Sequence, residues 1–161
     1  MEKLDFYQTA MGLINAETKK LDDFCDALNN NKLEKKAKIT EYKCAKYRYA
    51  GITNVWAMMY MNHRVGKRNC QTNHLTPKFN EIFVTFPSYV EIYNQAPDDE
   101  KTDFALYYGA LAFSDYKIAE LKSNILSAGD WERVELEERV GGIEFAKACL
   151  NEAWQKRGAC I

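Results

Sequence analysis

The feature that most constrains this chain is a regular stripe of mostly apolar residues near its N-terminus. The stripe advances in alternating steps of three and four residues and consists of Leu4, Tyr7, Met11, Ile14, Thr18, Leu21, Cys25 and Leu28. A helix with this heptad spacing presents one apolar seam to a partner helix. Asn29-Asn30-Asn31 follows and favours a helix end, because asparagine tolerates left-handed backbone. The pattern therefore predicts a long helix over residues 2–29 that packs against another helix.

A second stripe of the same kind supplies that partner. It consists of Tyr42, Ala45, Tyr49, Ile52, Trp56 and Met59. A helix over residues 33–62, joined to the first by a short polar turn, would form an antiparallel helical hairpin with Ile14 and Ile52 on facing seams. Gly51 lies inside this stripe and is expected only to weaken the helix, by about 1 kcal/mol at most.

The remainder of the chain also favours helices. Thr76-Pro77 is a good helix start, and so is Pro97, which is followed by three acids that favour the positive end of a helix dipole. Residues 79–95 and 132–146 fit either helix or strand. We expect helix in the first because its neighbours are helical. We expect helix in the second because steps of three and four are kept by Leu136, Val140, Ile143, Ala146, Leu150 and Ala153. Gly141-Gly142 can join two helices at this point.

These patterns predict one all-α domain over residues 1–161, a bundle of about five to seven helices built on the long N-terminal hairpin. The 161-residue length and the 47% hydrophobic content suit a single globular domain. No apolar run approaches the roughly 20 residues that span a bilayer, so we expect no membrane partner. The N-terminus lacks a signal-peptide layout and the five cysteines form no CxxC pair, which favours a cytoplasmic protein with reduced thiols.

Charge is distributed unevenly along the sequence. Residues 32–78 contain eleven lysines and arginines against two acids, whereas residues 91–152 contain fourteen acids against six bases. Fields of one sign steer association with a partner of the other sign. We therefore expect a basic partner surface formed by Lys35, Lys36, Lys38, Lys43, Lys46, Arg48, Arg64, Lys67 and Arg68.

Aromatic residues alternate with cations inside this basic segment. Tyr42, Tyr47 and Tyr49 stand among Lys43, Lys46 and Arg48. Cations beside aromatic rings suit nucleic-acid backbones and stacked bases. On a helix, however, Tyr42 and Tyr49 fall on the core stripe while the lysines face outward. Nucleic-acid contact through residues 32–78 therefore stays open beside the alternative of a protein partner.

One short stretch resembles a catalytic motif. Arg68, Asn69 and His74 are similar to the signature of HEPN ribonucleases, small all-α proteins whose paired Arg and His cleave RNA in a dimer. The resemblance implies that His74 transfers a proton at the ribose hydroxyl while Arg68 holds the phosphate. The family places its motif on a helix, whereas residues 69–73 are poor helix formers, and a six-residue step rotates about 240° on a helix. We therefore interpret the stretch as a polar connector between helices, with a ribonuclease as the alternative.

Other site motifs are absent from the sequence. Cys70 and His74 are spaced for a shared metal on a helix, but a structural zinc site needs four ligands and the chain has two histidines. No nucleophile elbow, dinucleotide-binding loop or Walker loop occurs. We expect no metal and no cofactor.

The sequence thus favours a non-enzymatic structural or adaptor subunit of a larger protein assembly. The excess of aromatic residues suits protein interfaces. Basic and acidic regions of neighbouring copies are expected to meet head to tail, as in an oligomeric ring such as a virion head-to-tail connector. The alternatives are the HEPN-like ribonuclease and a cytosolic nucleic-acid-binding regulator.

Overall fold

The structure of the protein, a computed structural model, describes residues 2–68 and 74–160, with backbone only for residues 65–68. It is all-α in this part of the chain, which confirms the predicted helical bundle. The order of elements is α1 (Phe6–Asn30), α2 (Lys32–Ala37), α3 (Ile39–Arg68), α4 (Pro77–Phe83), α5 (Pro87–Gln95), the 3-10 helix η1 (Asp98–Glu100), α6 (Lys101–Ile125) and α7 (Asp130–Lys156).

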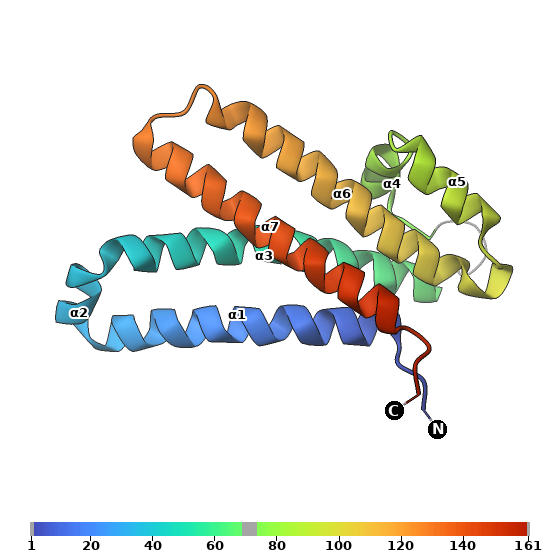
Figure 1. Ribbon diagram of the computed structural model, residues 1–161, viewed down its shortest axis with the longest axis horizontal. Helices are drawn as coiled ribbons and strands as arrows, with labels where there is room; N and C mark the ends of the chain where they lie inside the picture. Colours follow the sequence, from blue (N-terminus) through green and yellow to red (C-terminus); the bar gives the residue numbers. More distant parts are fainter. Residues whose placement is uncertain (1, 69–73, 161) are drawn as a thin grey trace.

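The first two long helices, α1 and α3, lie side by side with α2 between their ends (Figure 1). α1 begins after Asp5, whose Oδ1 accepts a hydrogen bond from the Gln8 amide at 2.8 Å. The polar turn expected between the helices contains a helix of its own. Asn31 caps α2 by accepting from the Glu34 amide at 3.1 Å. α3 consequently starts at Ile39, later than the predicted residue 33.

The segment left open between helix and strand, residues 79–95, contributes two short helices. A proline stands at the start of each, at Pro77 in α4 and Pro87 in α5. Proline suits this position because the amides of the first helical residues have no intrahelical hydrogen-bond acceptor, so the missing N–H costs nothing. Both helices pack against α6, and Phe79 meets Phe113 of α6 edge-to-face at 5.2 Å. The predicted cap Thr76 makes no side-chain cap bond; its amide donates to the buried Asn62 at 2.9 Å.

The second open segment, residues 132–146, lies inside one continuous helix. α7 runs from Asp130 to Lys156, so no join between helices occurs at Gly141-Gly142. Asp130, which the sequence suggests as the N-cap of this helix, is its first residue; Gly129 takes the N-cap position and makes no side-chain cap bond.

These glycines serve the packing of α7 on α3. A Cβ atom added at Gly142 would collide with the carbonyl oxygen of Arg48, and one added at Gly51 would collide with the carbonyl oxygen of Arg139. Each helix therefore contributes one glycine that lets the backbone of the other come close. Gly51, expected only to weaken a helix, is instead required for this crossing.

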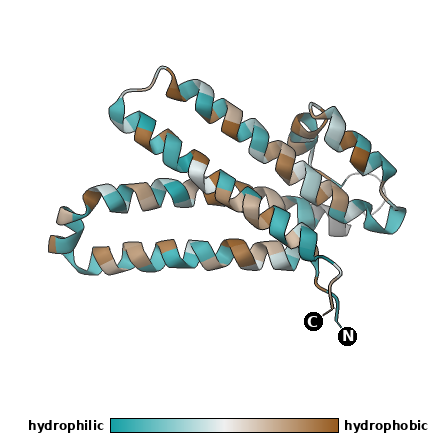
Figure 2. Ribbon diagram, in the orientation of Figure 1, coloured by the Kyte–Doolittle hydropathy of each residue, from teal (hydrophilic) through white to brown (hydrophobic). Residues whose placement is uncertain are grey.

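The core lies where α1, α3, α6 and α7 meet. Its most deeply buried side chains, all under 2% exposed, are Phe6, Ile14, Ile52, Val55, Met58, Met59, Ile143 and Leu150, together with the polar Asn62 and Ser114. Brown and teal residues alternate along the helices in Figure 2, as expected for amphipathic helices that share a core.

The two ends of the chain pair with each other beside the C-terminal end of α7 (Figure 1). The amide of Leu4 donates to the carbonyl of Ala159 at 2.9 Å, and the amide of Gly158 donates to the carbonyl of Leu4 at 3.0 Å. Gly158 has φ 74°, a left-handed backbone that favours glycine and turns the chain back. The ends are thus tied together by main-chain hydrogen bonds.

Candidate functional site

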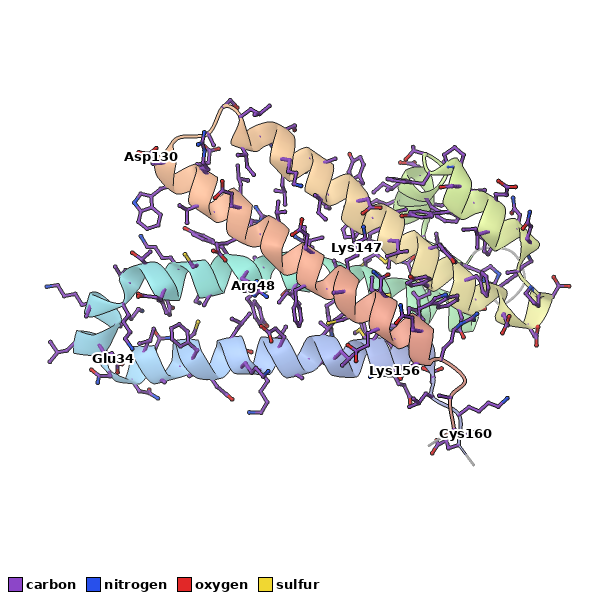
Figure 3. All side chains as sticks on the ribbon, in the orientation of Figure 1. Glu34, Arg48, Asp130, Lys147, Lys156 and Cys160 are labelled. Atoms are coloured by element: carbon purple, nitrogen blue, oxygen red, sulfur yellow. The ribbon has the colours of Figure 1, made fainter. Side chains whose placement is uncertain are left out.

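The first part of the expected basic surface lies on α2 and the start of α3. Lys36 is exposed, whereas Lys38 pairs with Glu34 at 3.1 Å in an exposed contact. Lys35 donates to Asn29 at 2.7 Å. Figure 3 shows Glu34 at the tip of the molecule, away from the core. Because exposed ion pairs contribute only about 0–1 kcal/mol each, these lysines remain available to a partner.

Tyr42 sits among these cations. The ammonium of Lys35 lies 4.3 Å from its ring centroid and that of Lys46 lies 5.5 Å away. Burial opposes ionisation of this phenol, yet hydrogen bonds with Asn29 and Lys46 and the two nearby charges lower its pKa overall. The two ammonium groups beside Tyr42 place positive charge at this end of the molecule.

Two further members of the surface are engaged within the chain. Arg48 lies 3.8 Å from Glu17 of α1 and 5.4 Å from the ring centroid of Phe145 in α7, with about a third of its side chain exposed. Figure 3 shows Arg48 between these helices. Lys43 lies over the ring of Trp131 at 4.9 Å. The guanidinium of Arg48 therefore helps to hold α1, α3 and α7 together.

The remaining three members lie at the other end of α3. Arg64 donates to the Tyr60 hydroxyl at 3.3 Å and lies 5.6 Å from that ring's centroid. Lys67 and Arg68 end the helix, and their side chains are outside the described residues. A helix rises about 1.5 Å per residue, so Lys43 and Arg64 are separated by about 30 Å along α3. The basic segment thus forms two separate groups rather than one patch.

Two leucines are the most exposed large apolar side chains among the described residues. Leu33 of α2 is 84% exposed and Leu126, after α6, is 86% exposed. Leu33 stands among Lys32, Lys35 and Lys36. Sequence reasoning missed Leu33, although a single leucine in a lysine-rich polar stretch was a usable signal.

The ribonuclease alternative depends on Arg68 and His74, which the structure describes unequally. The Arg68 side chain, Asn69 and Cys70 fall outside the described residues. His74 is partly buried, with Nδ1 3.3 Å from the Thr102 hydroxyl and the ring 6.0 Å from that of Tyr93. Burial, and then the charge of Lys101, lowers its pKa. The imidazole is therefore packed among residues of α5 and α6.

The other histidine has a packing role. His63 of α3 stacks on Tyr7 of α1 with ring centroids 3.6 Å apart and planes 3° from parallel. Among the described residues, no group of three or more His, Cys, Asp or Glu is placed to hold a metal ion. Burial raises the pKa of Cys149 to about 11, which keeps this thiol protonated and unreactive.

A polar link joins α5, α6 and α7. The Tyr89 hydroxyl of α5 donates to Asp115 of α6 at 2.9 Å, and Lys147 of α7 donates to the same carboxylate at 2.6 Å. Burial first, and then the hydrogen bond to Asp115, raises the pKa of Tyr89 to about 12. Sequence reasoning did not identify this link, because its members are separated by 26 and 32 residues.

A shallow hollow lies beside this link, on the outer side of α4 and α5. It has a volume of about 380 Å³ and is lined by Val84, Pro87, Val90, Glu91, Asn94 and Gln95. Val84 is 56% exposed, and Ile92 on the same helix pair is 37% exposed. Three apolar residues and three polar ones, including one carboxylate, line the hollow, which suits an apolar side chain with a cation beside it.

The sequence matches no protein-family model, and no curated protein or solved structure is significantly similar to it. None of the described helices has the length and hydropathy needed to cross a bilayer.

Proposed function

We propose that the protein is a non-enzymatic structural or adaptor subunit that binds other protein chains through the α2 end of the bundle. The single observation that carries the proposal is the side-chain composition of that end. A leucine that is 84% exposed stands on a six-residue helix whose neighbouring side chains are mostly lysines. An apolar side chain with charged residues around it offers a protein partner an anchor to bury and a polar rim.

The finer form of the proposal is an oligomeric ring, of which a virion head-to-tail connector is one example. A ring needs two different surfaces on each subunit, since heterologous contacts close by rotation. The lysines of α2 supply one such surface, and the excess of acids over residues 91–152 supplies opposite charge for a second. Incorporation into an assembly of cytoplasmic subunits follows from the same proposal.

The ribonuclease alternative has less support. His74 is partly buried and its Nδ1 is engaged by Thr102, so the ring has a structural use where it lies. Nucleic-acid binding keeps the support of Tyr42 and Tyr60, each of which lies near a lysine or arginine. The experiment below therefore includes an RNA arm.

In the experiment, a photo-crosslinking amino acid replaces Lys36, and crosslinked complexes are recovered from source cells. They are compared with those of a second chain that carries the same crosslinker together with Lys35→Glu and Lys38→Glu. We expect a defined protein complex that disappears in the charge-reversed chain. Crosslinker at Lys122, an exposed lysine on α6, is the matched control and should give no complex.

Purified protein is then mixed with labelled single-stranded RNA, and anisotropy is measured at about 50 mM and about 500 mM salt, where screening lengths differ about threefold. Absence of any protein complex at Lys36 rejects the proposal. Salt-sensitive RNA binding that requires the same lysines would favour the nucleic-acid regulator in its place. RNA cleavage lost in His74→Ala would favour the ribonuclease.

A further inference from the structure

We infer that the protein binds a second copy of itself head to tail, with Leu33 of one copy seated in the α4–α5 hollow of the next. This inference rests on the proposed function and names its partner and the two surfaces in contact. It joins three observations: an exposed apolar side chain, an apolar hollow, and opposite charges around the two.

The projecting surface is α2. Leu33 is 84% exposed, while Lys32 and Lys36 beside it are exposed cations. The helix is fixed at both ends, because Asn31 caps it and the amide of Lys38 donates to the Glu34 carbonyl at 2.8 Å. Leu33 is therefore held outward on a short rigid element, and its burial by a partner requires little ordering of the chain.

The receiving surface is the hollow on α4 and α5. Val84, Pro87 and Val90 form its apolar part, and Glu91, Asn94 and Gln95 form its polar part. Its volume of about 380 Å³ leaves room for a leucine side chain with part of a neighbouring lysine stem. The hollow is rigidly backed, since Phe83 meets Tyr93 at 5.9 Å and Tyr89 is bonded to Asp115.

The charges around the two surfaces are complementary. Residues 32–38 contain four lysines against one glutamate, whereas residues 77–101 contain five acids against two lysines. One of these two is Lys101, whose ammonium donates to the carbonyls of Tyr93 and Asn94. Like-charged surfaces would repel in a two-fold contact that matched each surface to itself. The contact that brings opposite charges together places α2 of one copy against α5 of the other.

The position of the two surfaces decides the kind of assembly. Figure 1 shows α2 at one end of the long axis of the molecule and α4, α5 and η1 at the other. Contact between opposite ends leaves one free surface of each kind on every pair, so copies add in a ring or an open row. A six-residue helix on a nine-residue helix buries less than the standard interface, so we expect a dissociation constant on the order of 100 µM.

The experiment is sedimentation velocity of the purified full chain from about 10 µM to about 1 mM, a range that brackets the expected dissociation constant. The wild type should show a mass that rises with concentration and falls with added salt. Leu33→Asp and Val90→Asp should each weaken self-association at least tenfold. Leu126→Asp is the matched control, because Leu126 is equally exposed in a different turn, and it should associate like the wild type.

A mixture of Leu33→Asp and Val90→Asp is the most specific test of the proposed contact. Val90→Asp retains Leu33, and Leu33→Asp retains the hollow, so an equimolar mixture should form a pair that neither variant forms alone. Growth should stop at that pair, because its two remaining surfaces both carry the aspartate. Circular dichroism should show that each variant keeps the wild-type helical signal.

A wild type that remains monomeric up to about 1 mM overturns the inference, since even weak self-association is detectable at that concentration. Self-association that survives both Leu33→Asp and Val90→Asp overturns it as well. Either result leaves the proposed function standing if Lys36 still crosslinks to another protein, so the failures of the two proposals are distinguishable.

Discussion

The α3–α7 crossing and the α2 end place contrasting demands on their residues. At the crossing, Gly51 and Gly142 admit the carbonyls of Arg139 and Arg48, and no side chain larger than hydrogen fits. At the α2 end, Leu33 has most of its surface in water. The first region is specified by its own packing, whereas Leu33 at the second is left largely unpacked by the described residues.

This difference separates stability from interaction. Helix crossings depend on close packing, so a substitution there changes the free energy of unfolding. A side chain that contacts little within its own chain contributes little to that free energy, and its chemistry is free to serve a partner. The same kind of substitution should therefore have opposite consequences in the two regions.

The largest expected effect is that of Ile14→Asp in the core. Ile14 is 0% exposed, so the variant buries a carboxyl group without a partner and should lose about 4 kcal/mol of unfolding free energy. Urea denaturation followed by circular dichroism measures the loss. Asn15→Asp, at the exposed neighbouring position, should unfold near the wild-type midpoint. Equal midpoints for Ile14→Asp and Asn15→Asp would contradict the assignment of this helix face to the core.

The next largest effect tests the crossing itself. Gly142→Ala should cost about 3 kcal/mol, because the added methyl group meets the Arg48 carbonyl and α3 has to move away. Gly141→Ala is the matched control, since its methyl group would meet only Arg48 Nη1 at 3.6 Å, an ordinary contact. It should gain about 0.5–1 kcal/mol from better helix propensity. Thermal melts of the two variants should shift in opposite directions, and shifts of the same sign would argue against the close approach.

A smaller effect concerns the polar link on α5, which connects the hollow to the crossing helices. Tyr89→Phe removes a hydrogen bond to a carboxylate and should cost about 1.5 kcal/mol at neutral pH. The Tyr89 pKa is raised from 10.0 to about 12, so the native state holds its proton more tightly than the unfolded chain. The wild type should therefore lose stability as pH rises from 10 to 12, and its advantage over Tyr89→Phe should shrink across that range.

Tyr116→Phe provides the reference for that titration. Tyr116 is 43% exposed on α6, and its replacement should leave the unfolding midpoint near that of the wild type at neutral pH. Chemical denaturation of the three proteins at several pH values makes the comparison. A stability gap between wild type and Tyr89→Phe that stays constant to pH 12 would contradict the raised pKa.

The smallest expected effect is on the stability of Leu33→Asp. Leu33 is exposed, so the change in unfolding free energy should stay within about 0.5 kcal/mol. Like Ile14→Asp, this variant replaces an apolar side chain with a carboxylate, but at the α2 end and not in the core. The sample is kept below the concentrations at which the protein self-associates, so that the measurement reports the unfolding free energy of the monomer alone. A loss of several kcal/mol would place Leu33 in the fold and remove it from the interface.

The bundle was accessible from sequence because its long helices carry strong periodic patterns. The stripe that includes Ile14 and the one that includes Ile52 both predicted side chains that are now seen fully buried. Phe6 was missed although it is also buried, because it lies beside the heptad seam and faces Tyr107 and Trp154, at 5.5 and 5.3 Å. The heptad pattern identifies one buried face of a helix, whereas a helix that packs against several neighbours buries more than one face.

Backbone contacts were less accessible. Gly51 and Gly142 are separated by a long stretch of sequence. The sequence alone does not distinguish a glycine that only weakens its helix from one that lets a second helix pack closely. Only the placement of α3 on α7 distinguishes the two cases.

The candidate site was predicted as a segment and is found as separate groups. Charge counting identified the lysines of α2, but a long straight helix carries Arg64 far from them, and Arg48 packs between helices. The hollow on α4 and α5 could not be foreseen, since it depends on how two short helices meet. Leu33 was visible in the sequence, but its exposure was not.

The pairing of Leu4 with Gly158 and Ala159 makes the backbone nearly a closed loop. A short linker from residue 160 back to residue 2 would complete that loop without disturbing a helix. New ends could then be opened in the turn after α6, where Leu126 and Ser127 are exposed. Such a permuted chain would keep every helix in place while any cargo fused to its ends emerged from a different side of the bundle.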